Sequence, residues 1–422
     1  MRILLQAPIL TQSGYGEHSR LVFESLKHHG DVFLSPLQWG KTAWKVSEAS
    51  DEVIAAINKQ ENYIEVNKKL GKEPEYDIQV HVGIANEFQK KAPYSVLVTA
   101  GIETDRVSPN WLIKTHEGID KIIVPSQHAA AGFENTTYQV TTEDKSVNRE
   151  DKILRCNCPV EVVPYPAKHF EKLPEPLDLN LKTDFNFLTI ALLGPRKNIE
   201  NQIKWFMEEF KDDPNVGLIL KTSLAKSSII DRRNTRAHIT KIMAPYKTSK
   251  CKLYLLHGSM TEPEVNSLYV HPKVNAYLTT SHGEGYGLPI FEAAYNGLPI
   301  VATDWSGHLD FLSGKIKQAG KMKAKKLFCR IDYALKEIPE NAVWKDILHK
   351  GSKWAYPLEI SAKRQMRNMF KNSAMYTKWA KSLKDQIHVS FEESHVKSAM
   401  AVAILSEPKQ TTTPIESQAL VL

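Results

Sequence analysis

One segment of the chain constrains its fold more than any other. An apolar strand over 274–280 runs into three glycines and then into a helix that begins near Pro289. Proline suits a first helical turn because the N–H it lacks would have no partner inside the helix. Gly283, Gly285 and Gly287 allow the backbone to bend sharply and to approach a ligand. The free N–H groups of such a helix start favour an anion, above all phosphate. The segment therefore predicts a strand–turn–helix unit with an anion site that includes Tyr286 and Leu288.

Two carboxylates bracket this predicted site. Glu284 lies before the helix, and Glu292 lies inside it among Ile290, Phe291 and Ala293. These apolar neighbours indicate that Glu292 is buried, and a buried carboxylate is costly unless it is hydrogen-bonded. A sugar or ribose diol would supply two O–H donors. The alternative interpretation is a surface Glu284 beside an unusual buried Glu292.

Strands and helices alternate along both halves of the chain, which favours an α/β fold with two doubly wound parallel sheets. The first half predicts strands near 2–9, 31–35, 76–84, 94–102, 121–125 and 160–165, and helices near 17–28, 50–69, 108–118 and 127–133. The second half predicts strands near 186–193, 216–222, 251–257, 274–280 and 299–303, and helices near 198–210, 227–243, 262–270 and 288–296.

Composition shifts suggest the boundaries between these parts. We expect domains over 1–170 and 186–360, joined by a proline-rich linker over 171–185. A basic helix is predicted over 361–388. The tail over 389–422 loses its periodicity and ends in low-complexity sequence, so we expect it to be disordered.

Cations follow two strands of the second half. Arg196 and Lys197 come after the strand near 186–193, and Lys221 ends the next one. Parallel strands bind ligands beyond their carboxyl ends, so these three side chains are candidates for holding a diphosphate. Charges that face water are the alternative interpretation.

Candidate residues in other loops are less specific. Gly14 and Gly16 lie in the first strand–helix turn, which any tight connection could explain. Glu103 and Asp105 follow the strand near 94–102 and could bind hydroxyl groups, although helix capping near Thr104 and Asp105 is an equal alternative. His308, in the turn after the strand near 299–303, is a candidate acid or base.

Composition excludes some classes of protein. No apolar run approaches the eighteen or so residues of a membrane helix, and no targeting signal is evident, so we expect no membrane insertion and a cytoplasmic location. The four cysteines do not form a disulfide framework at this length. The histidines lack metal-ligand spacing and there is no Asp-x-Asp, so we expect neither a metal nor a cofactor.

The segment from Lys315 to Arg330 carries six lysines and one arginine without an acid. It predicts either a solvated basic face or an approach surface for an anionic acceptor or membrane headgroups.

The Glu-x7-Glu pattern between the glycine turn and the Gly-Leu-Pro helix start resembles the donor site of retaining glycosyltransferases of the GT-B fold, family four in particular. The resemblance covers about 1–390 and is strongest over 274–310. It implies that Glu284 binds the transferred sugar, that Glu292 binds the nucleotide ribose, and that helix-start amides hold the diphosphate. It further implies an Arg and a Lys that stabilise the leaving diphosphate. That pair is usually spaced more widely than Arg196 and Lys197, so Lys221 could take the second role.

The resemblance also implies that the Gly14–Gly16 turn reaches the donor, that the loop with Glu103 faces the sugar, and that the C-terminal helix crosses back to the first domain. We therefore expect a nucleotide-sugar-dependent glycosyltransferase, retaining and metal-independent. The expected catalytic residues are Arg196, Lys197, Lys221 and Glu284. The acceptor could be a glycan, a lipid or DNA. The alternatives are a DNA-base-modifying glycosyltransferase or nucleotide-sugar epimerase on the same fold, or a non-catalytic binding protein.

Overall fold

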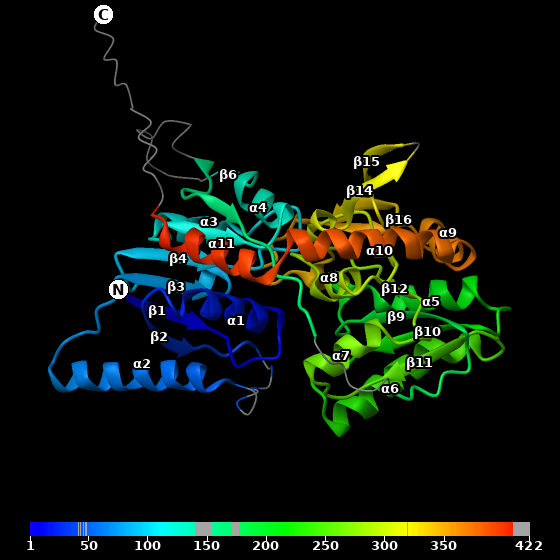
Figure 1. Ribbon diagram of the computed structural model, residues 1–422, viewed down its shortest axis with the longest axis horizontal. Coiled ribbons are helices and arrows are strands. Elements are labelled where there is room, and N and C mark those ends of the chain that lie inside the picture. Colours follow the sequence, from blue (N-terminus) through cyan, green and yellow to red (C-terminus); the bar gives the residue numbers. More distant parts are fainter. Residues whose placement is uncertain are drawn as a thin grey trace, which may run out of the picture.

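The computed structural model describes residues 1–40, 42, 44, 46, 49–139, 153–170, 177–318 and 320–407. Two six-stranded parallel sheets lie side by side, each flanked by helices (Figure 1). The first sheet has the order β2-β1-β3-β4-β5-β8. Its strands are β1 (Arg2–Ala7), β2 (Asp31–Pro36), β3 (Ile78–Val82), β4 (Tyr94–Val98), β5 (Lys121–Val124) and β8 (Val160–Val162), and its helices are α1 (Gly14–Leu26), α2 (Asp51–Lys69), α3 (Pro109–His116) and α4 (Gln127–Glu134).

The second sheet repeats this arrangement with the order β11-β10-β9-β12-β13-β16. Its strands are β9 (Phe185–Ile190), β10 (Val216–Lys221), β11 (Lys252–Leu256), β12 (Ala276–Leu278), β13 (Ile300–Thr303) and β16 (Cys329–Ile331). Its helices are α5 (Ile199–Glu209), α6 (Ile229–Met243), α7 (Glu262–Tyr269) and α8 (Leu288–Tyr295). The strands and helices expected over 2–303 are thus all present, and the α/β class with two doubly wound sheets is confirmed.

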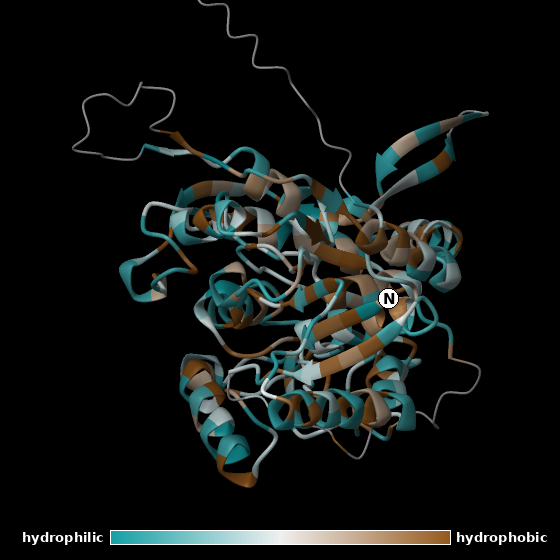
Figure 2. Cartoon of the chain, turned by 90° about the vertical axis from the view of Figure 1, so that its left-hand side faces the viewer, coloured by the Kyte–Doolittle hydropathy of each residue, from teal (hydrophilic) through white to brown (hydrophobic). Residues whose placement is uncertain are grey.

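Both sheets reverse direction at an internal strand. The chain moves outward from β1 to β2 and then returns to place β3 on the other side of β1. The same reversal places β12 beside β9 in the second sheet. The loops that follow the two central strands diverge at such a point and leave a crevice for ligands. Figure 2 shows hydrophobic residues concentrated along the inner strands, with hydrophilic residues frequent on the surrounding helices.

Three short antiparallel strand pairs, which were not predicted from the sequence, are added to the two parallel sheets. They are β6 (Tyr138–Gln139) with β7 (Ile153–Leu154), β14 (Ser313–Gln318) with β15 (Lys321–Lys326), and β17 (Tyr333–Glu337) with β18 (Lys353–Pro357). The basic segment after Lys315 is therefore mostly a two-stranded ribbon, and Figure 1 shows it projecting from the second domain.

The C-terminal helices differ from the expected boundaries. The segment predicted as one helix over 361–388 forms α9 (Glu359–Lys371) and α10 (Ser373–Ser390), which pack on the second domain. The crossing comes afterwards, where the amide of Ala167 donates to the carbonyl of Phe391 at 2.8 Å. The disorder expected from 389 is wrong for α11 (Glu393–Leu405), which packs against α1 of the first domain. Residues 408–422 lie outside the described part of the chain.

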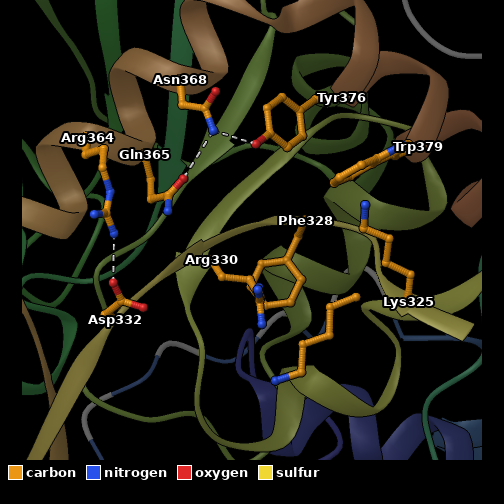
Figure 3. A pocket seen from close by; sticks show the side chains of 10 residues that line it. Lys325, Phe328, Arg330, Asp332, Arg364, Gln365, Asn368, Tyr376 and Trp379 are labelled. Atoms are coloured by element: carbon orange, nitrogen blue, oxygen red, sulfur yellow. Dashed lines mark hydrogen bonds and ion pairs between the residues drawn. The ribbon is translucent and has the colours of Figure 1, made fainter.

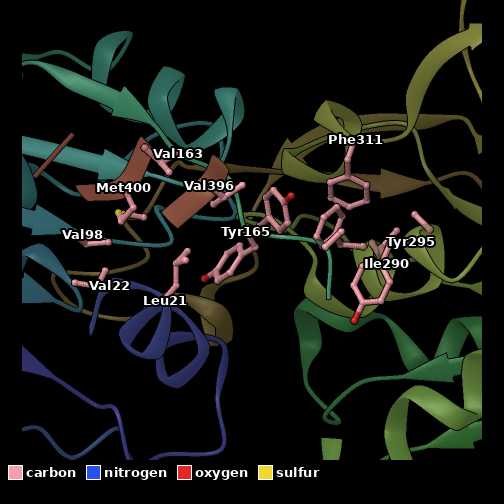
Figure 4. Packing of buried hydrophobic residues seen from close by; sticks show 14 of the residues in the cluster. Leu21, Val22, Val98, Val163, Tyr165, Ile290, Tyr295, Phe311, Val396 and Met400 are labelled. Atoms are coloured by element: carbon pink, nitrogen blue, oxygen red, sulfur yellow. The ribbon is translucent and has the colours of Figure 1, made fainter. Parts of the chain in front are cut away.

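One apolar cluster extends across both domains. Val396 and Met400 of α11 join Leu21 of α1 on one side, and Phe311 lies on the other (Figure 4). Tyr165 lies between the two groups, with its ring centroid 5.0 Å from that of Tyr286. The apolar residues of α11, a segment without clear periodicity in the sequence, therefore complete this core. Among the described residues, no helix is both long and apolar enough to cross a membrane.

Candidate functional site

The loops after β9 and β12 meet at the reversal point of the second sheet. Asn198, at the end of the first loop, donates from its side-chain amide to the carbonyl of Thr280 in the second at 3.2 Å. The amide of His282 donates to the carbonyl of Arg196 at 2.8 Å. Helix α8 begins immediately after this second loop, with Pro289 in its first turn. Gly287 precedes it with a φ of 92°, a conformation that favours glycine.

Arg196, Lys197 and Glu284 form a cluster in this crevice. Arg196 Nη1 donates to Glu284 Oε2 at 2.9 Å, and Lys197 Nζ donates to Oε1 at 2.6 Å. The residue Glu284 is only 6% exposed. Burial opposes its ionisation, but Lys197 and Arg196 outweigh burial and hold the pKa of the carboxyl well below its usual range. Glu284 is therefore an anion at neutral pH, clamped between two cations.

The two adjacent cations depend on the anions around them. Burial and the neighbouring charge of Arg196 lower the pKa of Lys197, although Glu284 acts in the opposite sense. For Arg196, burial also disfavours the charge, but Glu103 and Glu284 outweigh it and raise the pKa. Arg196 Nη2 lies 3.1 Å from Glu103 Oε1 of the first domain. A diphosphate could replace these carboxylates, because it also carries negative charge and offers pairs of acceptor oxygens to the fork of a guanidinium.

The glycines before α8 allow the two domains to touch. A Cβ atom on Gly283 would lie 2.1 Å from the carbonyl oxygen of Glu103, and one on Gly285 would lie 2.3 Å from that of Ala100. Ser126 Oγ also donates to the carbonyl of Gly285 at 2.5 Å. The sequence predicts that these glycines let the backbone approach a ligand. In this structure their lack of a side chain permits backbone contact between the domains.

Glu292 lies on α8, beyond the cluster. Tyr269 Oη donates to its Oε2 at 2.6 Å. The side chain is half-buried rather than enclosed on every side. Burial raises the pKa of Glu292 to about 7, against the opposing hydrogen bond from Tyr269. A carboxylate that is partly desolvated, and that has one oxygen without a protein donor among the described residues, can accept bonds from a diol.

Comparisons with known proteins identify the architecture. No family model and no curated protein sequence matches the chain. Solved structures do match over nearly the whole chain. Sucrose-phosphate synthase from Thermosynechococcus elongatus superposes with a TM-score of 0.59 at 14% identity, covering 95% of this chain and 97% of that one. HepE of Anabaena, in complex with UDP and glucose, gives 0.58 at 12% identity, with 95% and 98% covered. WaaG, a glycosyltransferase involved in lipopolysaccharide biosynthesis, gives 0.55 at 11% identity, with 96% and 100% covered.

The chain has the GT-B glycosyltransferase fold. The crevice with Arg196, Lys197 and Glu284 lies at the carboxyl ends of the central strands of the second sheet, where an open α/β sheet binds ligands. Both domains of the GT-B fold contribute to it, since Glu103 comes from the first.

Other residues predicted for the GT-B site lie at its edges. Gly14 faces Leu288 across the domain boundary, where a Cβ atom would lie 3.7 Å from Leu288 Cδ1. Gly16 instead has a local reason to be glycine, because a Cβ atom there would lie 2.0 Å from the carbonyl oxygen of Thr11. The Tyr286 side chain is buried among Tyr165 and Phe311. Only its backbone could therefore bind a ligand.

Three predicted residues do not join the cluster. Lys221 Nζ donates to the carbonyl of Gly258 at 3.1 Å, in the loop after β11. Asp105 Oδ1 accepts from the amide of Lys353 at 2.7 Å and so links the domains away from the crevice. His308 is buried, with Nε2 2.7 Å from the carbonyl of Thr303 and Nδ1 3.4 Å from Ser306 Oγ. Burial lowers the pKa of His308. Its contacts are those of a positioning residue rather than an acid or base.

Sequence reasoning missed two groups that surround Glu292. Tyr269 is its hydrogen-bond donor, but nothing in the sequence of α7 distinguishes it from a core tyrosine. Lys168 bridges Glu17 of α1, at 2.8 Å, and Glu262 of α7. Lys168 lowers the pKa of Glu292, whereas Glu17 and Glu262 raise it. The only signal in the sequence was Glu17 in the first turn of a helix.

Proposed function

We propose that the protein is a glycosyltransferase that moves a sugar from a nucleotide-sugar donor to an acceptor. One observation carries this proposal: two adjacent, half-buried cations, Arg196 and Lys197, are held against Glu284 in the crevice beside the start of α8. Such a site suits a diphosphate. Structures with the same fold support the proposal, because HepE holds UDP-glucose and an E. coli structure holds UDP-2-fluoro glucose.

The proposed reaction depends on positioning and electrostatics. As the bond between the sugar and the diphosphate breaks, its electron pair moves to the leaving phosphate oxygen. Arg196, Lys197 and the N–H groups at the start of α8 stabilise the growing negative charge. The acceptor oxygen then forms its bond to the same face of the sugar, and its proton moves to the leaving phosphate oxygen. The configuration of the sugar is thereby retained, and the reaction needs no metal and no cofactor besides the donor.

The two carboxylates take different parts in this proposal. Glu292 accepts hydrogen bonds from the ribose hydroxyls. Glu284 holds the cations in place until the donor arrives and is near enough to the diphosphate to contact the transferred sugar. Lys221, which faces Gly258, contributes at most to the positive rim. The acceptor is a glycan, a lipid or DNA, and the protein acts in the cytoplasm.

A screen of nucleotide sugars for hydrolysis without an acceptor tests the proposal. The wild-type protein should release nucleoside diphosphate from one donor, and Arg196→Ala should abolish most of this release. Glu117→Gln, an exposed change just after α3 of the first domain, serves as the control. Tight binding of a nucleotide sugar without release would indicate the non-catalytic binding protein. An epimerised nucleotide sugar would indicate the epimerase.

A further inference from the structure

The ribbon formed by β14 and β15 is a strongly basic surface of the second domain. It carries Lys315 and Lys317 on one strand and Lys321, Lys323, Lys325 and Lys326 on the other. Neither strand contains an acid. All of these lysines except Lys326 are exposed. Figure 1 shows that the ribbon stands away from the body of the molecule, so that its outer part is open on both sides.

The register places lysines on both faces of the ribbon. Lys315 pairs with Ala324 and Lys317 with Met322, so these lysines share one face. Lys323 pairs with Ile316 on the opposite face, together with Lys321. A flat anionic surface, such as a membrane, can meet only one face at a time. A groove with phosphates along both walls meets both faces at once.

Most of the charges on the ribbon have no carboxylate partner in the described part of the chain. Among the described residues, no carboxylate lies within ion-pair distance of Lys315, Lys317, Lys321, Lys323 or Lys325. Lys326, at the base, pairs with Asp304 at 2.6 Å. On each face the lysines follow one another along a single strand, Lys315 and Lys317 on β14 and Lys321, Lys323 and Lys325 on β15, and these like charges repel one another. An external polyanion would relieve this repulsion.

The ribbon is anchored firmly enough to present these charges. The amide of Lys315 donates to Gln386 Oε1 of α10 at 2.7 Å, and Gln386 Nε2 donates back to the carbonyl of Lys315 at 3.0 Å. Lys325 Nζ lies 3.9 Å from the centre of the Trp379 ring. These contacts fix the base of the ribbon on the second domain and leave the outer lysines free to contact a partner.

A cavity of about 590 Å³ at the base extends the positive surface (Figure 3). Its polar wall includes Arg330 and Arg364, and Tyr376 and Trp379 form part of its aromatic wall. Arg364 is paired with Asp332 at 2.9 Å, so the cavity is less strongly charged than the outer ribbon. The outer lysines are thus the more strongly charged part of this surface, and the cavity adjoins the base of the ribbon.

We propose that the β14–β15 ribbon docks into the major groove of duplex DNA. Two paired strands lie only about 4.8 Å apart, and the major groove of B-form DNA, about 12 Å wide, admits a two-stranded ribbon. The lysines on each face then contact the phosphates on the nearer wall. The major groove of double-stranded RNA is too narrow and deep for this arrangement. The inference is independent of glycosyl transfer and assigns a partner, not an acceptor.

Fluorescence anisotropy with a labelled DNA duplex of about 20 base pairs, over a series of salt concentrations, tests the proposal. The wild-type protein should bind at low salt and lose affinity steeply as salt rises. The variant Lys317→Gln/Lys321→Gln/Lys323→Gln should bind at least about tenfold more weakly at low salt. Its slope of log K against log salt should be shallower by about 2 to 3, because each lost phosphate contact removes about 0.9.

The matched control changes the same number of exposed lysines elsewhere. Lys68→Gln/Lys69→Gln/Lys72→Gln, at the end of α2, should bind DNA as the wild-type protein does. An equal loss of DNA affinity in this control would show that only the net charge of the protein matters, and it would overturn the proposal. So would the absence of duplex binding at low salt, equal affinity for double-stranded RNA, or binding to phosphatidylserine vesicles without binding to DNA. Donor hydrolysis by the ribbon variant should be unchanged, which separates this test from that of the enzymatic activity.

Discussion

Arg196 Nη2 lies 3.1 Å from Glu103 Oε1, across the boundary between the two domains. The same guanidinium also holds Glu284. Glu103 therefore competes with any diphosphate for Arg196. We expect Glu103→Gln to bind the nucleoside diphosphate of the donor about two- to fivefold more tightly, as the loss of a partly exposed ion pair predicts. Titration calorimetry measures the change, with Glu117→Gln as the control. Weaker binding would instead show that Glu103 contacts the ligand.

Arg196→Ala should lower kcat more than it raises the KM of the donor. The charge on the leaving diphosphate grows as the glycosidic bond breaks, so the contact with Arg196 strengthens toward the transition state. The expected loss in kcat is about a hundredfold or more. Lys221→Ala is the matched comparison, and its effect should be smaller because Lys221 points to Gly258. A change confined to KM would make Arg196 a binding residue only, and a larger loss in Lys221→Ala would reverse the assignment.

Glu292→Gln should keep the fold and weaken binding of the nucleoside diphosphate. Loss of a charge-assisted hydrogen bond costs about 1.5–3 kcal/mol, which is roughly ten- to a hundredfold in affinity. Calorimetric titration at neutral pH gives the value. The corresponding 2′-deoxyribose nucleotide is a useful second ligand, because the variant should discriminate less between the two. Unchanged affinity would remove Glu292 from the site.

Glu292 also predicts a pH dependence of stability in the absence of ligand. Its pKa is raised from 4.5 to about 7, so the folded state binds this proton more tightly than the unfolded state does. The free energy of unfolding should therefore fall as the pH rises from about 4.5 to about 7, by at most about 3 kcal/mol. Glu292→Gln should lack this part of the decline and exceed the wild type most clearly at pH 8. Denaturant unfolding at several pH values measures it. Parallel profiles for the two proteins would refute the assignment.

Helix α11 allows a test of whether the C-terminal part of the chain packs back on the first domain. Met400 is fully buried on α11, whereas Val402 on the same helix is 62% exposed. Met400→Ala should lower the free energy of unfolding by about 2–5 kcal/mol, since it leaves a cavity between α11 and the first domain. Val402→Ala should change it by less than about 0.5 kcal/mol. Chemical denaturation of both variants decides the matter, and equal stabilities would mean that α11 does not pack as the structure shows.

Much of this architecture could be predicted because its signals are local. Apolar strands, capping residues such as Ser50, Ser126 and Thr261, and glycine turns act within a few residues of one another. The cations Arg196 and Lys197 could be placed at a strand end for the same reason. Their junction with Glu284 follows from the reversal of the sheet, which the repeated alternation of strands and helices already implied.

The remaining features depend on contacts between distant residues. The sequence of α11 predicts disorder because the helix is stabilised mainly by packing its apolar face against α1, more than 350 residues earlier in the chain. The pairing of Tyr269 with Glu292 and the burial of Tyr286 and His308 arise from tertiary packing as well. The β14–β15 ribbon could not be predicted for a different reason. Lysine has a low strand propensity, so a segment with a lysine at every second position resembles a solvated coil.

Donor hydrolysis should survive an excess of chelator, and added magnesium or manganese should change its rate little. The physical reason is that Arg196, Lys197 and the N–H groups at the start of α8 can together balance the charge of a diphosphate. The backbone dipoles at the helix start are fixed before the reaction, so they need no reorganisation during it. Steady-state rates with and without chelator provide the measurement, and Lys197→Ala provides the comparison. Because this variant lacks one positive charge at the site, added magnesium should restore some of its activity. The same addition should leave the rate of the wild-type protein unchanged. Loss of wild-type activity on chelation, with recovery on manganese, would contradict the assignment and make Glu284 and Glu292 candidate metal ligands.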